Sequence, residues 1–494
     1  MQYKLSQKPR GFDHFIHGRS VAGVSAAEIT RYSPAHGVPV STYRDGTVQD
    51  VNEAVSAARH AFDHGDWPRL GGEGRAAVLL RAAALIRENC EELALVETLE
   101  SGKPIAQSRG EVMGAAGIWE YAAGAARTIH GDSFNSLGGG LFGLALREPI
   151  GVVGIITPWN FPFFILAERL PFVLGAGCTV VLKPSEFTSG TTVMMAGLLQ
   201  RAGLPDGVVN VVTGYGDPAG RAITEHMDVD MVSFTGSTAV GRSTLIASAR
   251  NIKKVGLELG GKNPQLVFAD ADLDAAADGV LFGVCFNSGQ CCVSGSRLLA
   301  HRSIVEPLAE RIVDLARRVR VGDPLEEETQ MGAIVNEKQM GRILGYIREG
   351  CEAGAKLLCG GARVPGTGLF VEPTVFTGVR PDMSIATDEI FGPVLGIQAF
   401  DTVEESLAIA NGTEYGLSAS IWTRDLDTAL RASREVKAGR VWVNTTITGG
   451  PEMPIGGFKQ SGLGRETGRY GIEEYTEVKA VQIQMGGRAP WVKE

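Results

Sequence analysis

The sequence predicts an α/β fold organised around a doubly wound parallel sheet. From residue 151 onward, short runs rich in β-branched residues alternate with stretches of helical length, which is typical of parallel strands joined by crossover helices. A length of 494 residues suggests two to four domains of roughly 150 residues each. The hydrophobic and charged fractions, 44% and 21%, are those of a globular chain rather than a disordered one.

Two alternating blocks carry this pattern. In the first, the runs GVVGIIT, TVVLKPS, VVNVVTG, MVSFTGS and KVGLELGG are separated by helix-sized stretches such as 191–202. In the second, after residue 261, PQLVFAD, VLGIQAF, SASIWTR and GRVWVNT are interleaved with expected helices over 401–410 and 425–437. We therefore expect two α/β domains.

The flanking segments differ from these blocks. Apolar residues at helical spacing over 50–65 and 75–99 predict that the first 125 residues are rich in helix. Residues 127–148 are rich in glycine yet apolar, which suits an arm that covers another surface better than a solvated linker. Residues 475–492 show a similar strand-like alternation.

Charge and cysteine content disfavour several functional classes. With 47 Lys and Arg against 56 Asp and Glu, the net charge of −9 disfavours a nucleic-acid partner. No stretch reaches the ~18 apolar residues that span a bilayer, so no membrane partner is expected. The seven cysteines lack the spacing of a disulfide framework, which favours a reducing, cytoplasmic location. The histidines are scattered, His60 and His64 suit an exposed helix face, and no metal site is expected.

Two glycine motifs raise the question of a phosphate-binding loop. The stretch 214–220 follows an expected strand but is too long for G-x-G-x-x-G, and the stretch 236–241 lacks the G-K-[ST] ending of a P-loop. A glycine pair at a strand-to-helix turn still exposes helix N-terminal amides to an anion. On these residues alone, nucleotide binding and an ordinary tight turn both stay open.

Three positions have the chemistry of a catalytic centre. Cys291 and Cys292 lie in a polar stretch bracketed by glycines, which suits a nucleophile, a packed thiol or a vicinal disulfide. Glu258 falls on a strand expected to be buried, where a carboxylate needs a task or a salt-bridge partner. Asn160 follows the GVVGIIT strand, where open α/β sheets place their ligands, although it also suits a turn between prolines.

The order of the motifs along the chain narrows these alternatives. PWNFP, KPSE, FTGS with Gly241, LELGGK, GQCC, EIFGPV and PIGGFKQSGLGRE follow one another, and from about residue 15 to residue 481 the sequence resembles the aldehyde dehydrogenase superfamily, in its non-acylating branch. The resemblance implies an aldehyde dehydrogenase-like fold with three parts. These are a Rossmann-type NAD-binding domain over 1–126 and 150–259, a catalytic α/β domain over 260–470, and a small β oligomerisation arm over 127–149 and 471–494.

The resemblance also implies catalytic roles. Cys292 matches the nucleophile, because the family pattern Gln-x-Cys is fixed by Gln290, while Glu258 matches the general base. Asn160 matches the side-chain amide of the oxyanion hole. Because members that pass the acyl group to coenzyme A usually lack this Glu, water is the expected acyl acceptor. Glu466 is either a second carboxylate of a proton relay or a structural ion-pair partner.

The cofactor implied by the resemblance is NAD. Lys183 and Glu186 match the residues that hold the adenosine ribose hydroxyls, and a Glu at this point repels a 2′-phosphate, which favours NAD over NADP. Glu389 and Phe391 match contacts to the nicotinamide ribose. The full set of residues matched to the cofactor site is Ile156, Thr157, Trp159, Lys183, Ser185, Glu186, Gly216, Gly220, Phe234, Gly236, Ser237, Glu389 and Phe391.

The substrate implied by the resemblance is a small aldehyde. Phe161, Phe164 and Glu168 match positions that line the aldehyde tunnel, and Glu168 stands where many members have Trp. The stretch 451–454 resembles the loop of betaine-aldehyde and aminoaldehyde dehydrogenases. The carboxylates of Glu168 and Glu452 could attract a cationic tail; alternatively, Glu168 pairs with Arg169 or another Arg and does not contact the substrate. A general aliphatic aldehyde or a semialdehyde is the alternative substrate.

Two other functional classes and the assembly state complete the expectations. A non-catalytic member of the fold is disfavoured by the intact Cys292, Glu258 and Asn160. A cofactor-independent cysteine hydrolase would normally place a His beside its Cys, and none is recognisable. The apolar segment 133–146 and the C-terminal tail resemble the family's oligomerisation arm, so we expect a homo-oligomer, either a dimer or a tetramer.

Overall fold

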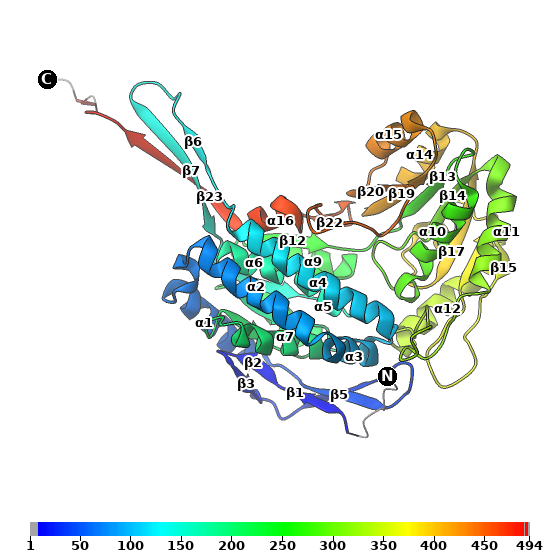
Figure 1. Ribbon diagram of the computed structural model, residues 1–494, viewed down its shortest axis with the longest axis horizontal. Coiled ribbons are helices and arrows are strands. Elements are labelled where there is room, and N and C mark those ends of the chain that lie inside the picture. Colours follow the sequence, from blue (N-terminus) through cyan, green and yellow to red (C-terminus); the bar gives the residue numbers. More distant parts are fainter. Residues whose placement is uncertain (1–7, 489, 493–494) are drawn as a thin grey trace.

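The computed structural model describes residues 8–488 and 490–492, and it consists of two α/β units and an extended arm (Figure 1). One unit is built around an eight-stranded sheet and the other around a seven-stranded sheet. Most neighbouring strands in both sheets pair in parallel. The predicted α/β fold with doubly wound sheets is confirmed.

The eight-stranded sheet has the order β22-β12-β11-β8-β9-β10-β2-β3. The chain passes from β8 through β9 to β10 on one side, and then through β11 to β12 on the other side. The boundary between β8 and β11 is therefore the switch point at which such sheets bind ligands. The strands are β2 (His14–Ile16), β3 (Arg19–Val21), β8 (Val152–Ile156), β9 (Thr179–Lys183), β10 (Val209–Val211), β11 (Met231–Thr235), β12 (Lys254–Glu258) and β22 (Gly462–Leu463).

Helices cover this sheet and bury its apolar side chains. Trp67, Leu79 and Trp119 are fully buried in the core that the helices form with the sheet. Among residues 8–488 and 490–492, no helix combines the length and hydropathy needed to cross a membrane. The helices are α1 (Val48–Asp63), the 3₁₀ turn η1 (Trp67–Arg69), α2 (Gly72–Glu88), α3 (Cys90–Ser101), α4 (Ile105–Ala126), α5 (Pro162–Ala167), α6 (Leu170–Ala176), α7 (Gly190–Arg201), the π turn η2 (Gly216–Gly220), α8 (Arg221–Glu225) and α9 (Thr238–Ser248).

The N-terminal region differs from its prediction in two ways. Helices begin only at Val48, and the preceding residues form short strands; besides β2 and β3 these are β1 (Arg10–Phe12), β4 (Glu28–Tyr32) and β5 (Pro39–Arg44). Strands of this length carry too few residues for their periodicity to stand out. The stretch 75–99 is divided between α2 and α3, because Asn89 donates its side-chain amide to the carbonyl of Leu85 (2.7 Å) and ends α2.

The seven-stranded sheet has the order β15-β16-β17-β14-β13-β19-β20. Its strands are β13 (Pro264–Val267), β14 (Arg297–His301), β15 (Lys356–Cys359), β16 (Thr374–Thr377), β17 (Val394–Phe400), β19 (Ser418–Trp422) and β20 (Arg440–Val443). The helices around it are α10 (Leu273–Cys285), the turns η3 (Phe286–Gly289) and η4 (Arg302–Ile304), α11 (Val305–Ala316), α12 (Glu337–Glu352), α13 (Ser384–Thr387), α14 (Val403–Asn411) and α15 (Leu426–Glu435). A small ladder joins β18 (Tyr415–Gly416) to β21 (Phe458–Lys459).

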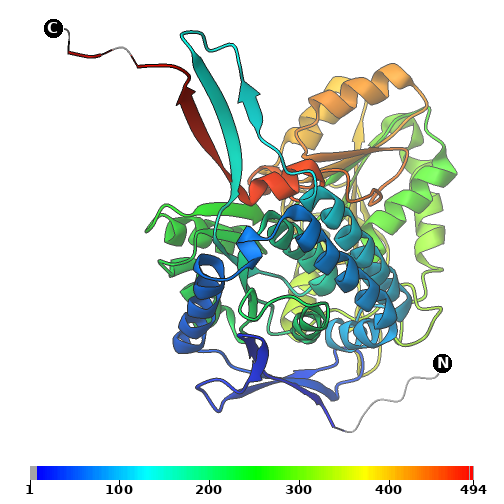
Figure 2. The same ribbon diagram turned by 60° about the vertical axis from the view of Figure 1, so that its left-hand side comes forward.

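A three-stranded arm projects from the two units (Figure 2). It pairs β6 (Asp132–Phe134) and β23 (Thr476–Gln484) antiparallel with β7 (Leu141–Pro149). The two segments expected to form an arm therefore do lie side by side. Between β22 and the arm, α16 (Gly468–Glu474) packs against α6.

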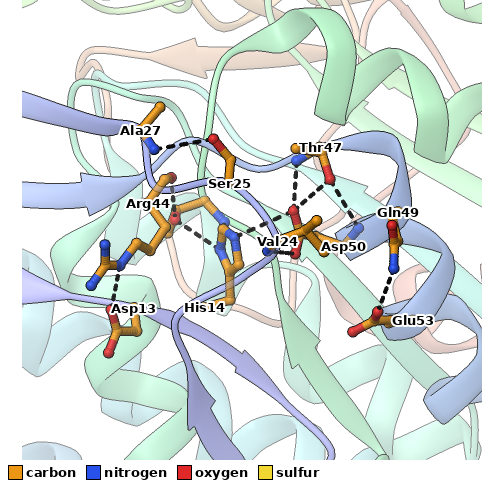
Figure 3. Close-up of polar contacts among 11 residues, drawn as sticks. Asp13, His14, Val24, Ser25, Ala27, Arg44, Thr47, Gln49, Asp50 and Glu53 are labelled. Carbon is orange, nitrogen blue, oxygen red and sulfur yellow. Dashed lines mark hydrogen bonds and ion pairs between the residues drawn. The ribbon is translucent and has the colours of Figure 1, made fainter.

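A buried polar cluster ties the N-terminal strands to the first helix (Figure 3). Asp50 accepts hydrogen bonds from the Thr47 amide (2.8 Å), the Thr47 hydroxyl (2.7 Å) and the Val24 amide (2.9 Å). His14 lies 3.9 Å from the same carboxylate, and its Nδ1 accepts from the Thr213 amide (3.2 Å), just after β10. Burial lowers the pKa of His14 although Asp50 opposes this, while hydrogen bonds from Thr47 and Val24 lower the pKa of Asp50, so the neutral imidazole lies beside an ionised carboxylate. The cluster thus joins β2, the start of α1 and the end of β10.

The first prediction concerns the stability of this cluster. Replacing Asp50 by Ala removes the capping box of α1 and leaves the Val24 amide without its acceptor, so the free energy of unfolding should fall by about 2–4 kcal/mol. Urea denaturation followed by circular dichroism measures this loss. As a control, Asp63→Ala at the exposed end of the same helix should change it by less than about 0.5 kcal/mol. Equal midpoints for Asp50→Ala and the unmodified protein would contradict the prediction.

Candidate active site

The predicted site residues gather at one edge of the eight-stranded sheet. Because β8, β9, β11 and β12 are parallel, the segments that follow them meet at their carboxyl ends, on both sides of the switch point. These segments hold residues 157–160 after β8, 184–186 after β9, and 236–237 after β11, while Glu258 ends β12. The strand-to-helix turn at 236–237 opens α9, as the glycine spacing suggested.

The loop before the cysteine pair has an unusual backbone. Asn287 (φ 51°), Ser288 (φ 55°) and Gly289 (φ 71°) are all in the left-handed region, which costs non-glycine residues about 1 kcal/mol or more each. The Ser288 hydroxyl donates to the Gly332 carbonyl (2.9 Å), and this bond helps to hold the strained turn. At Gly289 a Cβ would stand 2.2 Å from the backbone of Gly392, so only glycine fits. The turn directs the chain sharply from α10 toward the cysteines.

Hydrogen bonds fix Asn160 beside the cysteine loop. The Asn160 amide donates to the Gln290 carbonyl (3.2 Å), and the Asn287 amide donates to the Asn160 carbonyl (2.9 Å). The Asn263 amide donates to the Cys292 carbonyl (2.8 Å) from the other side. Since a side-chain amide has two N–H donors, Asn160 retains one for a further acceptor.

Cys292 and Glu258 line the same cavity. Its volume is ≈ 400 Å³, within the range of small-molecule sites. Phe161, Phe164 and Glu168, the residues predicted to meet the substrate, line it as well. The structure therefore brings together side chains that lie far apart in the sequence.

A buried arginine lies between the acidic side chains of this cavity. Arg169 approaches Glu466 (3.5 Å) and Glu168 (3.6 Å). Burial raises the pKa of Glu258 well above its usual value; the Arg169 charge opposes this, and the charges of Glu466, Cys292 and Glu168 add to it. The neutral carboxyl form of Glu258 is therefore favoured relative to a carboxyl in water.

Glu466 is tied into the same group of charges. It accepts hydrogen bonds from the Tyr475 hydroxyl (2.8 Å) and the Ser233 hydroxyl (3.1 Å). Burial raises the pKa of Glu466 to about 7, although Arg169 and these two hydrogen bonds oppose it. Both predicted roles are compatible with this geometry, because the residue has an ion-pair partner and can also exchange a proton near neutral pH.

The two cysteines differ in exposure but not in redox state. Both are free thiols; Cys291 is buried and Cys292 is partly exposed. The pKa of Cys292 is raised well above its usual value, mainly by a hydrogen bond with Cys291 and secondly by burial, so the resting thiol is neutral. Within the described ranges, no three His, Cys, Asp or Glu side chains are grouped to hold a metal ion. His60 in the last turn of α1 and His64 directly after this helix are both exposed.

The residues predicted to bind the adenosine end of a cofactor lie together after β9. Lys183 Nζ is 3.7 Å from Glu186 Oε2, and the Ser185 hydroxyl donates to that oxygen (3.4 Å). Gly220 in η2 faces this group, because a Cβ built on it would stand 3.6 Å from Lys183 Cδ. Gly216, at the other end of the same turn, is exposed.

A second set of cofactor candidates comes from the seven-stranded unit. Phe391 packs edge-on against Trp159 with ring centroids 5.3 Å apart. The Gly261 amide donates to Glu389 Oε1 (3.1 Å), and burial raises the pKa of Glu389 to about 7 against this bond. Both units therefore contribute to the site. The remaining candidates, Ile156, Thr157, Phe234, Gly236 and Ser237, lie along β8 and β11 and the turns that follow them.

Two charged residues of the cavity region were missed in the sequence. Lys103 pairs with Glu97 (2.7 Å) and Glu111, and its ammonium lies 4.5 Å from the ring centroid of Phe161. Arg440, at the start of β20, lines the cavity that contains Cys292. A charged residue directly before the apolar run VWV was the available signal for Arg440, by the same argument that singled out Glu258. No local pattern marks Lys103.

The comparisons with known proteins agree with this geometry. The family model described as "Aldehyde dehydrogenase family" matches residues 21–481. The chain is similar to aldehyde dehydrogenase family 2 member C4 from Arabidopsis thaliana, with 44% identity over 97% of this chain and 96% of the relative. It is also similar to the crystal structure of an NAD-dependent aldehyde dehydrogenase from Sinorhizobium meliloti, with 54% identity, a TM-score of 0.98 and coverage of 99% and 97% of the two chains.

A third similarity bears on the choice of substrate. The structure of betaine aldehyde dehydrogenase from Staphylococcus aureus in complex with NAD+ shares 33% identity with this chain, with a TM-score of 0.95 and coverage of 98% and 96%. Structures named only as aldehyde dehydrogenases and a structure named for one substrate therefore have similar TM-scores to this chain. What they have in common is membership of the family. The matches over nearly the whole length establish that this chain belongs to the aldehyde dehydrogenase family.

Proposed function

We propose that this protein oxidises an aldehyde to a carboxylic acid, with NAD as the hydride acceptor and water as the acyl acceptor. The observation that carries the proposal is the cavity that Cys292 and Glu258 line together, next to Asn160. A thiol and a carboxyl at one cavity are what the formation and hydrolysis of a thioester require. The similarity to an NAD-dependent aldehyde dehydrogenase supports it further.

The residues at the switch point fit NAD. Ser237 caps the N-terminus of α9, whose first-turn amides suit a pyrophosphate. The Glu186 carboxylate, beside Lys183, suits the two ribose hydroxyls and opposes a 2′-phosphate, so NADP is disfavoured. When bound, NAD supplies the acceptor for the hydride that leaves the substrate carbon. We extend the proposal to the other residues of the set, namely Ile156, Thr157, Trp159, Ser185, Gly216, Gly220, Phe234, Gly236, Glu389 and Phe391.

The first half of the reaction takes place on Cys292. Because its pKa is raised, the thiol must first transfer its proton to water in the cavity, and the resulting thiolate attacks the aldehyde carbon. The resulting thiohemiacetal carries an oxyanion, for which the free N–H of Asn160 and the backbone N–H of Cys292 are the proposed donors. Collapse of the oxyanion expels the hydride and leaves a thioester on the sulfur.

The second half depends on Glu258. Once deprotonated, its carboxylate takes a proton from a water that attacks the thioester carbonyl, which releases the acid and restores the thiol. Arg169 cannot act as a base, since a guanidinium stays protonated; its proposed role is to hold the surrounding carboxylates in place. Glu466 contributes a negative charge that keeps the proton on Glu258 at rest.

The substrate class is the finer part of the proposal. An aminoaldehyde or betaine aldehyde was expected from Glu168 and the loop 451–454. Glu168 does line the cavity, but Arg169 at 3.6 Å offsets its charge, and none of the residues lining the cavity comes from the loop. The charge of the substrate is therefore decided by other groups on the wall, which the following subsection considers.

The arm is proposed to join copies of this chain. Phe134 at the end of β6, Leu137 in the turn after it and Val478 in β23 have exposed fractions of 46%, 46% and 60%, and together they form the kind of apolar surface found at interfaces between proteins. The division into a cofactor domain, a catalytic domain and an arm, with the boundaries given above, belongs to the same proposal. Strand β22 belongs to the proposed catalytic segment, yet it pairs with β12 of the proposed cofactor domain.

The central test is absorbance at 340 nm with purified protein, NAD or NADP, and a panel containing propanal, 4-aminobutanal and betaine aldehyde. We expect NADH to form with at least one aldehyde and more slowly with NADP than with NAD. No reduction of either cofactor across a broad panel, despite measurable NAD binding, would overturn the proposed function.

The roles of Cys292 and Glu258 are separable in pre-steady-state kinetics. Cys292→Ala should abolish oxidation, because no thioester can form. Glu258→Gln should give one NADH burst per site with little further turnover, because the thioester is not hydrolysed. The exposed Cys351→Ala is the control for loss of a thiol and should turn over normally. Steady turnover by either active-site variant would contradict the assignment.

The raised pKa of Glu258 gives a pH dependence with a defined sign. The carboxylate is the active form in hydrolysis, so the turnover limited by that step should rise about tenfold per pH unit below this pKa and level off above it. Single-turnover hydrolysis of a preformed thioester between pH 5.5 and 9 isolates the step. In Glu258→Gln the residual rate should lose this rise; an identical profile in the variant would assign the titration to another group.

Assembly through the arm is tested by size-exclusion chromatography with light scattering. The protein should elute as a dimer or tetramer, and Val478→Asp should shift it toward smaller species by placing a charge on the apolar arm. Leu426→Asp, at an exposed position on α15, is the matched control. A monomeric mass for the unmodified protein would rule out the arm as an oligomerisation element.

A further inference from the structure

Arg440 occupies a fixed position on the wall of the catalytic cavity. It is the first residue of β20, at the edge of the seven-stranded sheet, and it lines the cavity together with Cys292. One guanidinium nitrogen, Nη2, donates to the Thr448 carbonyl (2.8 Å), and the guanidinium carbon lies 5.0 Å from the ring centroid of Trp442. Trp442 donates to the same carbonyl (2.7 Å), so the arginine is held in place by a ring and a backbone that are themselves connected.

The other charged side chains on this wall are compensated. Glu111 pairs with Lys103, and Glu168 lies 3.6 Å from Arg169. Arg169 in turn lies 3.5 Å from Glu466. Burial favours the neutral form of the Glu258 carboxyl, which raises its pKa, and Arg169 is the cation that opposes this.

Arg440 is the exception on this wall. Within residues 8–488 and 490–492, no carboxylate lies within 4.0 Å of the Arg440 guanidinium. Apart from the bond that Nη2 donates to Thr448, its N–H groups make no hydrogen bond to these residues and are available to a ligand. Burial lowers the pKa of Arg440, while Glu168 and Cys292 oppose this, which places those two groups within electrostatic range of it. Among the described residues, the wall therefore carries one cation that forms no ion pair within 4.0 Å, although Glu168 lies within electrostatic range of it.

A guanidinium held in this way is suited to one kind of ligand. Its planar fork of N–H donors matches the two oxygens of a carboxylate, and a partly buried cation gains most from an anionic partner. We propose that Arg440 binds a carboxylate at the far end of the substrate, so that the preferred aldehydes are ω-oxo acids. This inference rests on the proposed function, since it assigns the substrate class of the same cavity. Glu168 then limits affinity instead of attracting a cation.

The simpler explanation is that Arg440 only anchors the strand edge. The bond to Thr448 and the contact with Trp442 would satisfy that role, and a neutral side chain of similar length would then be tolerated equally for all substrates. The two explanations differ in whether the charge of Arg440 discriminates between an acid and its uncharged counterpart. The informative quantity is therefore a ratio of kcat/KM values rather than an activity.

The experiment compares three substrates of matched length: 5-oxopentanoate, its methyl ester and 4-trimethylammoniobutanal. For the unmodified protein, kcat/KM should be highest for the acid. In Arg440→Gln the ratio of acid to ester should fall roughly 10- to 100-fold, the usual effect of removing a hydrogen-bonded charge partner. Arg440→Lys should retain part of the preference. Glu168→Gln should raise kcat/KM for the acid by removing a like charge.

A binding measurement supports the kinetics and does not depend on turnover. Glutarate, which carries a carboxylate at each end, should bind the unmodified protein in calorimetry and bind Arg440→Gln at least tenfold more weakly. Arg434→Gln, an exposed residue on α15, changes the net charge by the same amount and should alter neither the ratio nor glutarate affinity. This control separates a local contact from the overall field of the protein.

The outcomes distinguish the two proposals. If aldehydes are oxidised but the acid is not preferred, or Arg440→Gln lowers all three kcat/KM values equally, the carboxylate site is overturned and the proposed function stands. If no aldehyde is oxidised but glutarate binds in an Arg440-dependent way, the proposed function fails and the anion site stands. A preference for the trimethylammonium aldehyde that Glu168→Gln abolishes would assign the cavity to cations and overturn the inference.

Discussion

The candidate active site depends on the burial of one arginine among several acids. Arg169 has an exposed fraction of 2%, and a guanidinium without compensation at such a position would cost several kcal/mol. Glu168, Glu466 and the Ile165 carbonyl surround it. The positive charge of Arg169 in turn reduces the repulsion between the carboxyl groups of Glu168 and Glu466, so these acids can lie close together near the cavity of Cys292. Removal of the arginine would force these acids apart or leave them all protonated.

The protonation states that result suit a site that must wait for its substrate. The pKa values of the Cys292 thiol and the Glu258 carboxyl are both raised, which favours their neutral forms, and these react with solvent components less readily than the ionised forms would. Hydrogen bonds hold the backbone of the cysteine loop in a strained turn. We therefore expect the reactivity of the site to depend on the protonation of Cys292 and Glu258 more than on movement of this backbone. The site therefore lowers the stability of the fold in two ways: burial removes its acidic side chains from water, and Asn287 and Ser288 adopt left-handed backbone angles.

Local motifs predicted the parallel strands and the strand-end placement of Asn160 and Glu258, whereas the common site of Cys292 and Phe161 was implied by the resemblance to the aldehyde dehydrogenase family. These succeed because each motif is short and its strand is apolar enough to recognise. The strands β1 to β5 were missed because they have few residues and mixed polarity. The charge balance of the cavity could not be predicted either, since Arg169, Lys103 and Arg440 are brought to one wall by the tertiary fold alone. The pairing of Glu168 with Arg169 was only one of two open alternatives in the sequence.

The pairing of β22 with β12 has a consequence for synthesis of the chain. Gly462 is in register with Glu258, and Glu466, three residues after β22 ends, approaches Arg169. The pocket built on β8 to β12 thus stays open at one edge until residues 462–466 have been synthesised, because β22 and Glu466 come about 200 residues after β12 in the sequence. A nascent chain that ends before residue 462 lacks both the closing strand and one acid of the site. Cys292 is therefore placed in a complete site only after this later segment has joined the sheet.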